Sequence, residues 1–205
     1  ALVLSSDGGP RTWGNPAAQA SLHRAWTKAT NEFRYDGRTF TLGLSMGGLT
    51  AALVTLQDVV PSRGLVLVAP RLNVREAVDG PDRERAAELR AAHHLTPGEA
   101  FPAGFDPINE FEKLAKVRPP AFIVVSEQDR TVNAWTNGIA FAQLLGAKAR
   151  LQVVTGGHLG SGMLNAAVGA EAARFLDGLW RGAPEPSPAP APLSARKASA
   201  RAPSP

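Results

Sequence analysis

The sequence predicts an α/β fold, a mostly parallel sheet with helices on both faces. Three observations support this prediction. Apolar runs at 64–69 and 120–125 are continuous, as expected of strands that are covered on both faces. Segments with apolar residues at helical spacing alternate with these runs. A strand predicted over 39–44 enters a Gly43-x-Ser45-x-Gly47 turn, from which a helical pattern leaves.

The first elements of the chain follow from local signals. Residues 1–4 read as a short buried strand, and the Gly, Pro and Asp content of 5–15 predicts a loop. Asn15-Pro16 provides an N-cap followed by Pro at the first helical position. Five apolar residues then share one helix face before Asp36-Gly37 ends the unit: Leu22, Ala25, Trp26, Ala29 and Phe33.

The remaining elements continue the alternation. The helix after Ser45 has an apolar face made by Leu49, Ala52, Leu53 and Leu56. An insertion over 71–107 interrupts the alternation of strands and helices. It contains a charged helix at 82–92 and a Pro/Gly-rich stretch. Beyond the 120–125 strand we expect a helix over 135–145 closed by Gly146, a strand over 150–154 and a terminal helix over 168–179.

Composition limits the domain organisation and the class of protein. The 205 residues favour one domain, which we expect to span 1–181, whereas the Pro/Ala/Ser-rich segment 182–205 is predicted to be a disordered tail. No run is long enough to cross a bilayer, and the start shows no signal-peptide pattern. The absence of cysteine excludes disulfides and thiol catalysis but leaves the compartment open. We expect a soluble, cytoplasmic protein.

The positive charge does not predict a nucleic-acid partner. The formal net charge is +4, and half of it comes from the residues 183–205. The other half is spread over the predicted domain without a basic cluster, so we expect no nucleic-acid binding.

The Gly43-x-Ser45-x-Gly47 spacing is typical of a nucleophile elbow. A serine on a sharp strand-to-helix turn adopts a strained backbone, and its neighbours two residues away must lack bulk where the strand and helix approach. We expect Gly43 and Gly47 to meet this need. The N-terminal dipole of the following helix would favour negative charge developing at Ser45.

Three predicted strands are each followed by a side chain that suits acyl-transfer chemistry. Ser45 follows the strand at 39–44, Asp129 follows the strand at 120–125, and His158 follows the strand at 150–154. The carboxyl ends of parallel strands meet at one edge of a sheet, so these side chains are expected to converge. Their order along the chain, Ser, Asp and His, is the order of an α/β-hydrolase triad.

Over 1–180 the chain resembles the α/β-hydrolase superfamily. Gly43-Leu-Ser-Met-Gly-Gly48 is similar to that family's elbow, Asp129-Arg-Thr-Val132 to its acid loop, and Gly156-Gly157-His158 to its histidine loop. The resemblance implies a Ser45 nucleophile, a His158 base and an Asp129 that orients the imidazole. It also implies that the Met46 backbone N–H donates to the oxyanion, and that neither a metal nor an organic cofactor takes part.

Other residues compete for these roles. Glu127 lies two residues before Asp129, but Asp129 occupies the place that the resemblance assigns to the acid. The His93-His94 pair lies in the insertion, where we expect a contribution to the pocket or lid rather than the catalytic base. His23 is expected on a helix surface. No carboxylate at metal-ligand spacing accompanies the adjacent histidines, so no metal site is predicted.

The beginning of the chain departs from the family pattern. Only one helix separates 1–4 from the elbow strand, so we expect the sheet's first strands, with the loop that normally supplies the second oxyanion donor, to be absent. In the alternative interpretation, Gly8 and Gly9 supply that donor. A missing donor costs roughly a hundredfold or more in rate.

The predicted substrate pocket draws on several segments. Trp13 either lines the pocket or packs at the start of the first helix, while Leu44 and Leu159 are expected to contact substrate. The insertion at 71–107 occupies the place of the family's cap. The predicted function is hydrolysis of a carboxylic ester or related small acyl compound. A peptidase or amidase using the same triad and a catalytically weak binding module are the alternatives, and the oligomeric state stays open.

Overall fold

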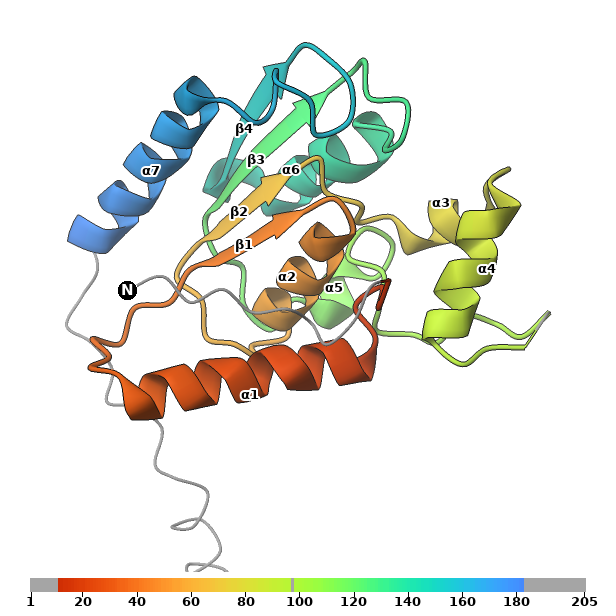
Figure 1. Ribbon diagram of the computed structural model, residues 1–205, viewed down its shortest axis with the longest axis horizontal. Coiled ribbons are helices and arrows are strands. Elements are labelled where there is room, and N and C mark those ends of the chain that lie inside the picture. Colours follow the sequence, from red (N-terminus) through yellow and green to blue (C-terminus); the bar gives the residue numbers. More distant parts are fainter. Residues whose placement is uncertain (1–10, 97, 183–205) are drawn as a thin grey trace, which may run out of the picture.

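The computed structural model describes residues 11–96 and 98–182. The predicted strand at 1–4, the proposed donors Gly8 and Gly9, and the predicted tail beyond Gly182 lie outside these ranges. Figure 1 shows a twisted sheet with a helix on either side and a pair of helices projecting from one end. No helix in the described ranges is both long and apolar enough to cross a membrane.

The sheet is parallel throughout and contains four described strands in the order β1-β2-β3-β4. They are β1 (Thr41–Leu44), β2 (Leu65–Val68), β3 (Ala121–Ser126) and β4 (Ala149–Val154). Every residue of β2 and β3 is buried, as their continuous apolar sequences predict. In β1 and β4, at the two sides of this sheet, several residues are exposed, among them Leu42 and Val153.

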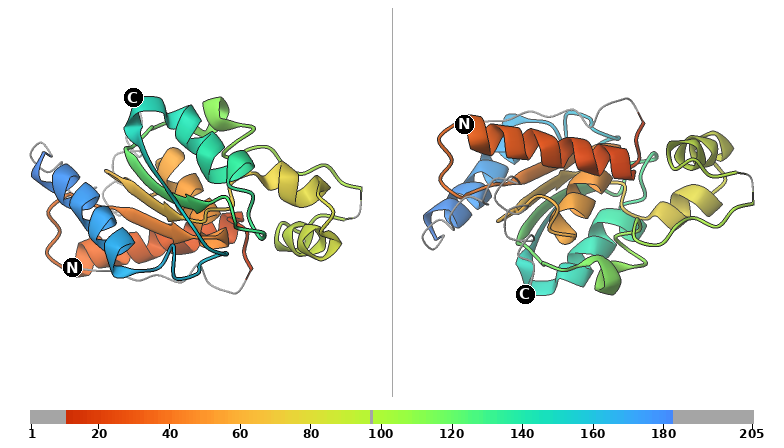
Figure 2. Two further views of the ribbon diagram at one scale, coloured as in Figure 1. Left: turned by 90° about the horizontal axis from the view of Figure 1, so that it is seen from above. Right: turned by 90° about the horizontal axis from the view of Figure 1, so that it is seen from below.

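Helices cover both faces of the sheet (Figure 2). One face packs on α2 (Met46–Leu56) and α6 (Ala140–Leu145), with α5 (Phe111–Leu114) beside them. The other face packs on α7 (Ala166–Arg181) through apolar residues of β2 and β3. The two faces have separate apolar cores, so the carboxyl edge between them stays free to carry polar side chains. The predicted fold class is therefore confirmed.

The first helix, α1 (Pro16–Glu32), begins as predicted, with the Asn15 side chain accepting a hydrogen bond from the Ala18 amide and Pro16 at the first helical position. It lies beside α2. The expected apolar face of α1 is wrong in part, because Ala18 and Gln19 are its buried residues and Phe33, just beyond the helix, is 63 % exposed.

The insertion contains α3 (Val74–Asp79) and α4 (Arg83–Ala92). Both helices have polar N-caps, Asn73 and Asp82, each accepting a hydrogen bond from a backbone amide three residues on. Apolar residues of the insertion form a third cluster with Trp13 and with Leu49 and Leu53 of α2. The insertion is thus anchored to the domain beside the elbow.

The segment between β3 and β4 contains an unexpected irregularity. The predicted helix over 135–145 consists of a π-helical turn (Trp135–Ile139) followed by α6, and it ends at Gly146, whose φ is +59°. A 3-10 turn (Gly146–Lys148) leads into β4. At Gly138, an added Cβ would lie 2.3 Å from Val125 Cγ1, so the glycine lets the π-helical turn pack closely on β3.

Candidate active site

Ser45 occupies the turn between β1 and α2 and has φ +49° and ψ −119°. A side chain at such a φ is strained, so surrounding contacts must hold the backbone in place. The Ser45 amide donates to the Val68 carbonyl, and the Ser45 carbonyl accepts from the Gly48 and Arg71 amides. These bonds fix the serine at the carboxyl end of β1, with its side chain at the edge of the sheet.

The glycines of this turn do not share the expected role. An added Cβ at Gly43 would lie 2.5 Å from the Gly47 carbonyl oxygen and 2.6 Å from the Gly48 Cα. At Gly47, by contrast, an added Cβ would meet nothing within 4 Å, so the predicted need for a small residue there is wrong. The close approach falls instead at Gly48, whose Cβ would lie 2.8 Å from the Pro70 Cβ.

Asp129 follows β3 and is held by its own loop. Its Oδ1 accepts hydrogen bonds from the Thr131 and Val132 amides, at 2.8 and 3.0 Å. Its Oδ2 lies 2.7 Å from His158 Nδ1, and only 2 % of the side chain is exposed. Because one carboxylate oxygen binds the loop and the other faces the imidazole, the carboxylate is oriented before any ligand arrives.

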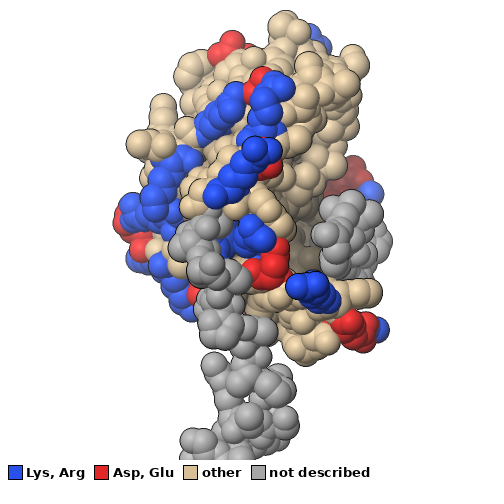
Figure 3. Space-filling model, turned by 90° about the vertical axis from the view of Figure 1, so that its left-hand side faces the viewer, with Lys and Arg blue, Asp and Glu red and all other residues tan. Residues whose placement is uncertain are grey.

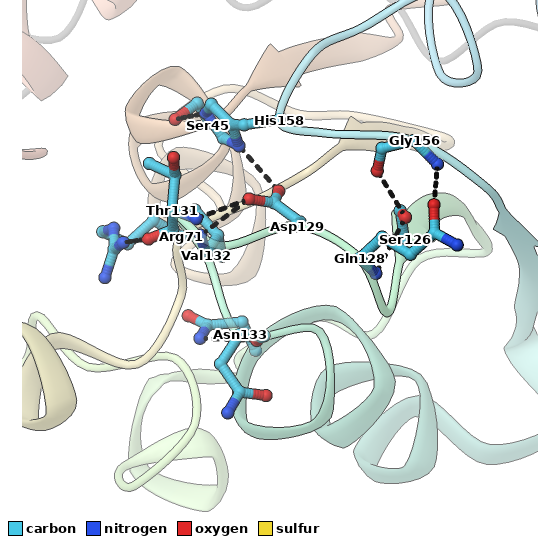
Figure 4. Close-up of polar contacts among 11 residues, drawn as sticks. Ser45, Arg71, Ser126, Gln128, Asp129, Thr131, Val132, Asn133, Gly156 and His158 are labelled. Carbon is cyan, nitrogen blue, oxygen red and sulfur yellow. Dashed lines mark hydrogen bonds and ion pairs between the residues drawn. The ribbon is translucent and has the colours of Figure 1, made fainter.

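His158 follows β4 and lies between Asp129 and Ser45 (Figure 4). Its Nε2 lies 2.9 Å from Ser45 Oγ. A carboxylate can only accept, so Nδ1 donates to Asp129 and Nε2 is left to accept the Ser45 hydroxyl proton. The three predicted side chains therefore form one continuous chain of hydrogen bonds, although they lie far apart in the sequence.

The competing residues lie elsewhere. Glu127 is exposed, and the carboxylate that faces His158 Nδ1 is that of Asp129. His93 lies at the end of α4, where its Nε2 is 3.0 Å from the Trp13 carbonyl oxygen and its ring contacts Phe101 and Phe105. Burial lowers the pKa of His93. His23 stacks on Trp26 in α1.

Arg71 joins two of the three loops and was not singled out from the sequence. Its amide donates to the Ser45 carbonyl, and its side chain donates to the Thr131 carbonyl of the acid loop. The residue is only 4 % exposed. Burial lowers the pKa of Arg71, as does the positive charge of Arg85, while Glu76, Asp129 and Asp82 act in the opposite direction. A charged residue three positions after a fully apolar strand was the available signal.

A cleft of about 520 Å³ opens between the insertion and the acid loop. Its lining includes Arg71, Glu76, Arg85, Asp129 and Trp135, whose side chain is among the exposed large apolar ones. Asp129 belongs both to this cleft and to the hydrogen-bond chain, so the cleft lies beside that chain. Ser45 and His158 do not line it.

The other predicted site residues differ in their surroundings. Trp13 is 4 % exposed and packs in the apolar cluster of the insertion, away from the lining of the cleft. Leu44 is 39 % exposed at the end of β1, and Leu159 packs against the core beneath α7. Met46 is the first residue of α2, so its N–H has no carbonyl partner within the helix.

No protein-family model matches the chain, and no curated protein matches it. Solved structures do resemble it. Esterase Pf2001 of Pyrococcus furiosus has a TM-score of 0.58 at 15 % identity, over 83 % of this chain and 65 % of that one. The esterase Est2 of Thermogutta terrifontis has 0.56 at 20 %, over 82 % and 66 %. MGS-MChE2, an alpha/beta hydrolase enzyme from lagoon-sediment metagenome, has 0.51 at 17 %, over 78 % and 70 %.

The extent of this similarity is limited in two ways. The chain spans 62 % of the length of Pf2001 in a second crystal form of that esterase, and 60 % of esterase PE8. All of these identities lie between 13 and 20 %. At that level the similarity concerns the arrangement of strands and helices, and the chemistry must be argued from the side chains of this chain.

Proposed function

We propose that this chain, which has the α/β-hydrolase fold, hydrolyses a carboxylic ester or related small acyl compound through an acyl-enzyme. One observation carries the proposal: Ser45 Oγ lies 2.9 Å from His158 Nε2, and His158 Nδ1 lies 2.7 Å from Asp129 Oδ2. A serine hydroxyl is a weak nucleophile unless a base takes its proton during attack. In this proposal His158 is that base and Asp129 is the group that orients it, and the two distances support these roles.

In the proposed reaction, Ser45 Oγ attacks the acyl carbon while its proton passes to His158 Nε2. The carbonyl π electrons move onto oxygen, and the resulting oxyanion accepts a hydrogen bond from the Met46 N–H. Asp129 stabilises the imidazolium without taking its proton. The oxyanion collapses, the bond to the leaving alcohol breaks, and His158 protonates that alcohol. Water then repeats the sequence on the acyl-enzyme, releasing the acid and restoring Ser45.

The second oxyanion donor stays a proposal about residues outside the described ranges. Gly8 or Gly9 would supply it if the loop before α1 reaches Ser45. Without a second donor the same triad would work more slowly, by roughly a hundredfold or more. This leaves open the alternative of an α/β-hydrolase-like module that binds a ligand and turns it over poorly.

We further propose that the cleft beside the triad receives part of the substrate and that 71–107 acts as a cap over the 1–181 domain. The moderate volume of the cleft and its charged lining favour a short acyl compound over a long-chain lipid. The Thermogutta esterase Est2 has been solved with propionate and with butyrate bound. These short acids agree in size with the compounds proposed for this chain.

The test is covalent labelling of the 205-residue chain with a fluorophosphonate probe, which reacts with activated serine hydroxyls. We expect labelling of the unmodified protein, loss of labelling in Ser45→Ala, and unchanged labelling in Ser21→Ala, a matched change on α1. Persistent labelling of Ser45→Ala would refute the assignment of the nucleophile. A folded protein that is not labelled at all would favour the binding module.

A panel of matched substrates then separates ester from amide hydrolysis. Esters and anilides of the same short acid differ only in the leaving group. We expect turnover of the esters to exceed that of the anilides. In the proposal the cleft holds the acyl part, and the triad alone suffices to expel an alcohol or phenol as the leaving group. Preferential cleavage of anilides or peptides would establish the peptidase or amidase alternative.

A further inference from the structure

The peptide groups at Gly156 are hydrogen-bonded by two residues just before Asp129, namely Ser126 at the end of β3 and Gln128 (Figure 4). Ser126 Oγ donates to the Gly156 carbonyl oxygen at 2.7 Å. The Gly156 amide donates to Gln128 Oε1, also at 2.7 Å. We call these three residues, Ser126, Gln128 and Gly156, the Gly156 clasp. It joins the loop that carries Asp129 to the loop that carries His158.

The clasp begins where the sheet ends. The last pair of the β3–β4 ladder is Ser126 with Val154. Beyond this pair, within the described residues, the hydrogen bonds between the two loops are those of the clasp and the Asp129–His158 contact. The relative position of the carboxylate and the imidazole therefore depends on few bonds, two of which the clasp provides.

Each side of the clasp is coupled to a triad residue through the backbone. The Asp129 amide donates to the Ser126 carbonyl at 3.1 Å, and the Gln128 amide donates to Ser126 Oγ at 3.1 Å. The Ser126 hydroxyl thus accepts a bond within the acid loop while it donates to the histidine loop. Gly156 lies two residues before His158 and has φ +110°, a conformation that glycine adopts readily.

We propose that Ser126 and Gln128 are positioning residues, which set the distance and angle between Asp129 and His158 without touching substrate. The inference rests on the proposed function for its catalytic meaning. Ser126 is 1 % exposed, so its hydroxyl is largely sheltered from water, and replacing it removes the donor to the part-buried Gly156 carbonyl. Gln128 is exposed, so its bond competes with water and contributes less.

The experiment compares Ser126→Ala, Ser126→Thr and Gln128→Met by ester kinetics and by imidazole 15N NMR. The 15N shifts report which ring nitrogen carries the proton. We expect Ser126→Ala to lower kcat about tenfold with KM within about twofold, because small misplacements of catalytic groups are costly. Its His158 shifts should move away from the Nδ1–H tautomer. Ser126→Thr, which keeps a hydroxyl, should recover most of both effects.

Gln128→Met should have a smaller effect of the same kind, about threefold in kcat. The combined Ser126→Ala and Gln128→Met change should cost less than the product of the two single effects, because both bonds hold the same residue. Gln143→Met, the same exchange at an exposed site on α6, should leave kinetics and 15N shifts unchanged. If Ser126→Ala does not fold, Gln128→Met alone decides the question.

The outcomes are separable from those of the labelling test. If esters are not turned over, the proposed function fails, while the 15N shifts still report whether the clasp orients His158. Wild-type shifts in both Ser126→Ala and Gln128→Met would overturn the clasp. So would a lower free energy of unfolding with unchanged kcat and shifts, since that result identifies Ser126 as a packing residue only.

Discussion

Ser45 has a backbone conformation that residues with a side chain rarely adopt. The three nearby glycines differ in how closely other atoms approach them. Gly43 faces the backbone of α2, whereas Gly47 faces open space. Gly48 approaches Pro70, which follows β2. The strand and the helix that flank Ser45 are therefore pressed together on one side of the turn.

Gly43→Ala and Gly47→Ala form a matched pair that tests this asymmetry. We expect Gly43→Ala to lower the free energy of unfolding by about 2 kcal/mol or more, because its Cβ meets backbone atoms that cannot move aside. Gly47→Ala should leave stability unchanged or raise it by up to about 1 kcal/mol, since alanine favours helix. Urea denaturation measures both, and equal losses would contradict the geometry.

A second pair of variants separates the two acids of the loop after β3. Asp129→Asn should lower kcat about 10⁴-fold, because an amide in place of the carboxylate no longer stabilises the Nδ1–H tautomer and the imidazolium. Glu127→Gln should change kcat by less than about threefold, because Glu127 is exposed and His158 Nδ1 faces Asp129 instead. Ester kinetics at neutral pH provide the measurement. A larger loss in Glu127→Gln than in Asp129→Asn would reassign the acid.

Among the elements, the start of the insertion is held to the domain by hydrogen bonds to one buried polar side chain, in addition to the apolar cluster described above. Asn137 is fully buried in the π-helical turn, and its Oδ1 accepts from the Leu72 and Asn73 amides at 2.7 and 2.8 Å. Its Nδ2 donates to Glu76 Oε2 and to the Asn133 carbonyl oxygen, both at 3.0 Å. The start of the insertion is thereby held against the segment that follows the acid loop.

Asn137→Leu should therefore loosen the insertion. It keeps a similar volume but leaves the buried Leu72 amide and the part-buried Asn73 amide without their acceptor, and an unsatisfied buried amide costs about 1–3 kcal/mol. We expect a clear loss in the free energy of unfolding and faster hydrogen exchange at the Leu72 and Asn73 amides. Asn31→Leu, on the exposed side of α1, should change stability by less than about 0.5 kcal/mol. Unchanged exchange at both amides would contradict this role.

We expect His93, at the end of α4, to make the free energy of unfolding depend on pH. Burial lowers the pKa of His93, and the positive charge of His94 lowers it further, while the bond to Trp13 raises it. The folded state therefore binds a proton less readily than the unfolded state, whose histidine pKa is about 6.5. Stability should be unaffected above that value and should fall as the pH drops below it.

Urea denaturation at pH 7.5 and pH 5 measures this effect. The fall in the unfolding midpoint should be smaller in His93→Gln, which does not titrate and keeps an N–H for the Trp13 carbonyl. His94→Gln, one residue further on, should retain most of the wild-type fall. An identical fall in wild type and His93→Gln would show that other groups cause the pH dependence.

The strands could be predicted from sequence because their signals are local, and the expectation that Ser45, Asp129 and His158 lie close together follows from their places after three strands. An apolar run of 64–69 identifies a strand, and Ser45, Asp129 and His158 each follow such a strand. The exchange of roles between Gly47 and Gly48 could not be predicted, because it depends on Pro70 in another loop. Ser126, Gln128 and Arg71 likewise act through partners in other loops, which neither periodicity nor spacing identifies.

On the scale of the whole molecule, the apolar cores and the candidate active site occupy different parts of the sheet. Two apolar cores lie on its two faces, and the polar side chains discussed above gather at the carboxyl edge. Figure 3 shows a different face, where lysine and arginine side chains alternate with acidic ones. Oppositely charged side chains form ion pairs in the described part of the chain, including Arg38–Asp36 and Arg181–Asp177. Exposed pairs of this kind add little stability.

On the proposed function, the cleft between the insertion and the acid loop predicts a limit on substrate length. In a series of p-nitrophenyl esters from acetate to palmitate, we expect kcat/KM to peak at two to about six acyl carbons. A cleft of about 520 Å³ with charged walls does not shelter a long alkyl chain. Stopped assays below the micelle concentration of each ester provide the measurement. A maximum at long chains would exclude this cleft as the acyl site.

The separation of Ser45 and His158 by 113 residues has a consequence for synthesis on the ribosome. The hydroxyl leaves the exit tunnel long before the imidazole has been translated, and the strand that delivers the imidazole is the last of the four described. On the proposed function, a nascent chain would carry an inert alcohol until translation of the domain is nearly finished. Reactivity toward acyl compounds would then begin only after His158 has left the ribosome.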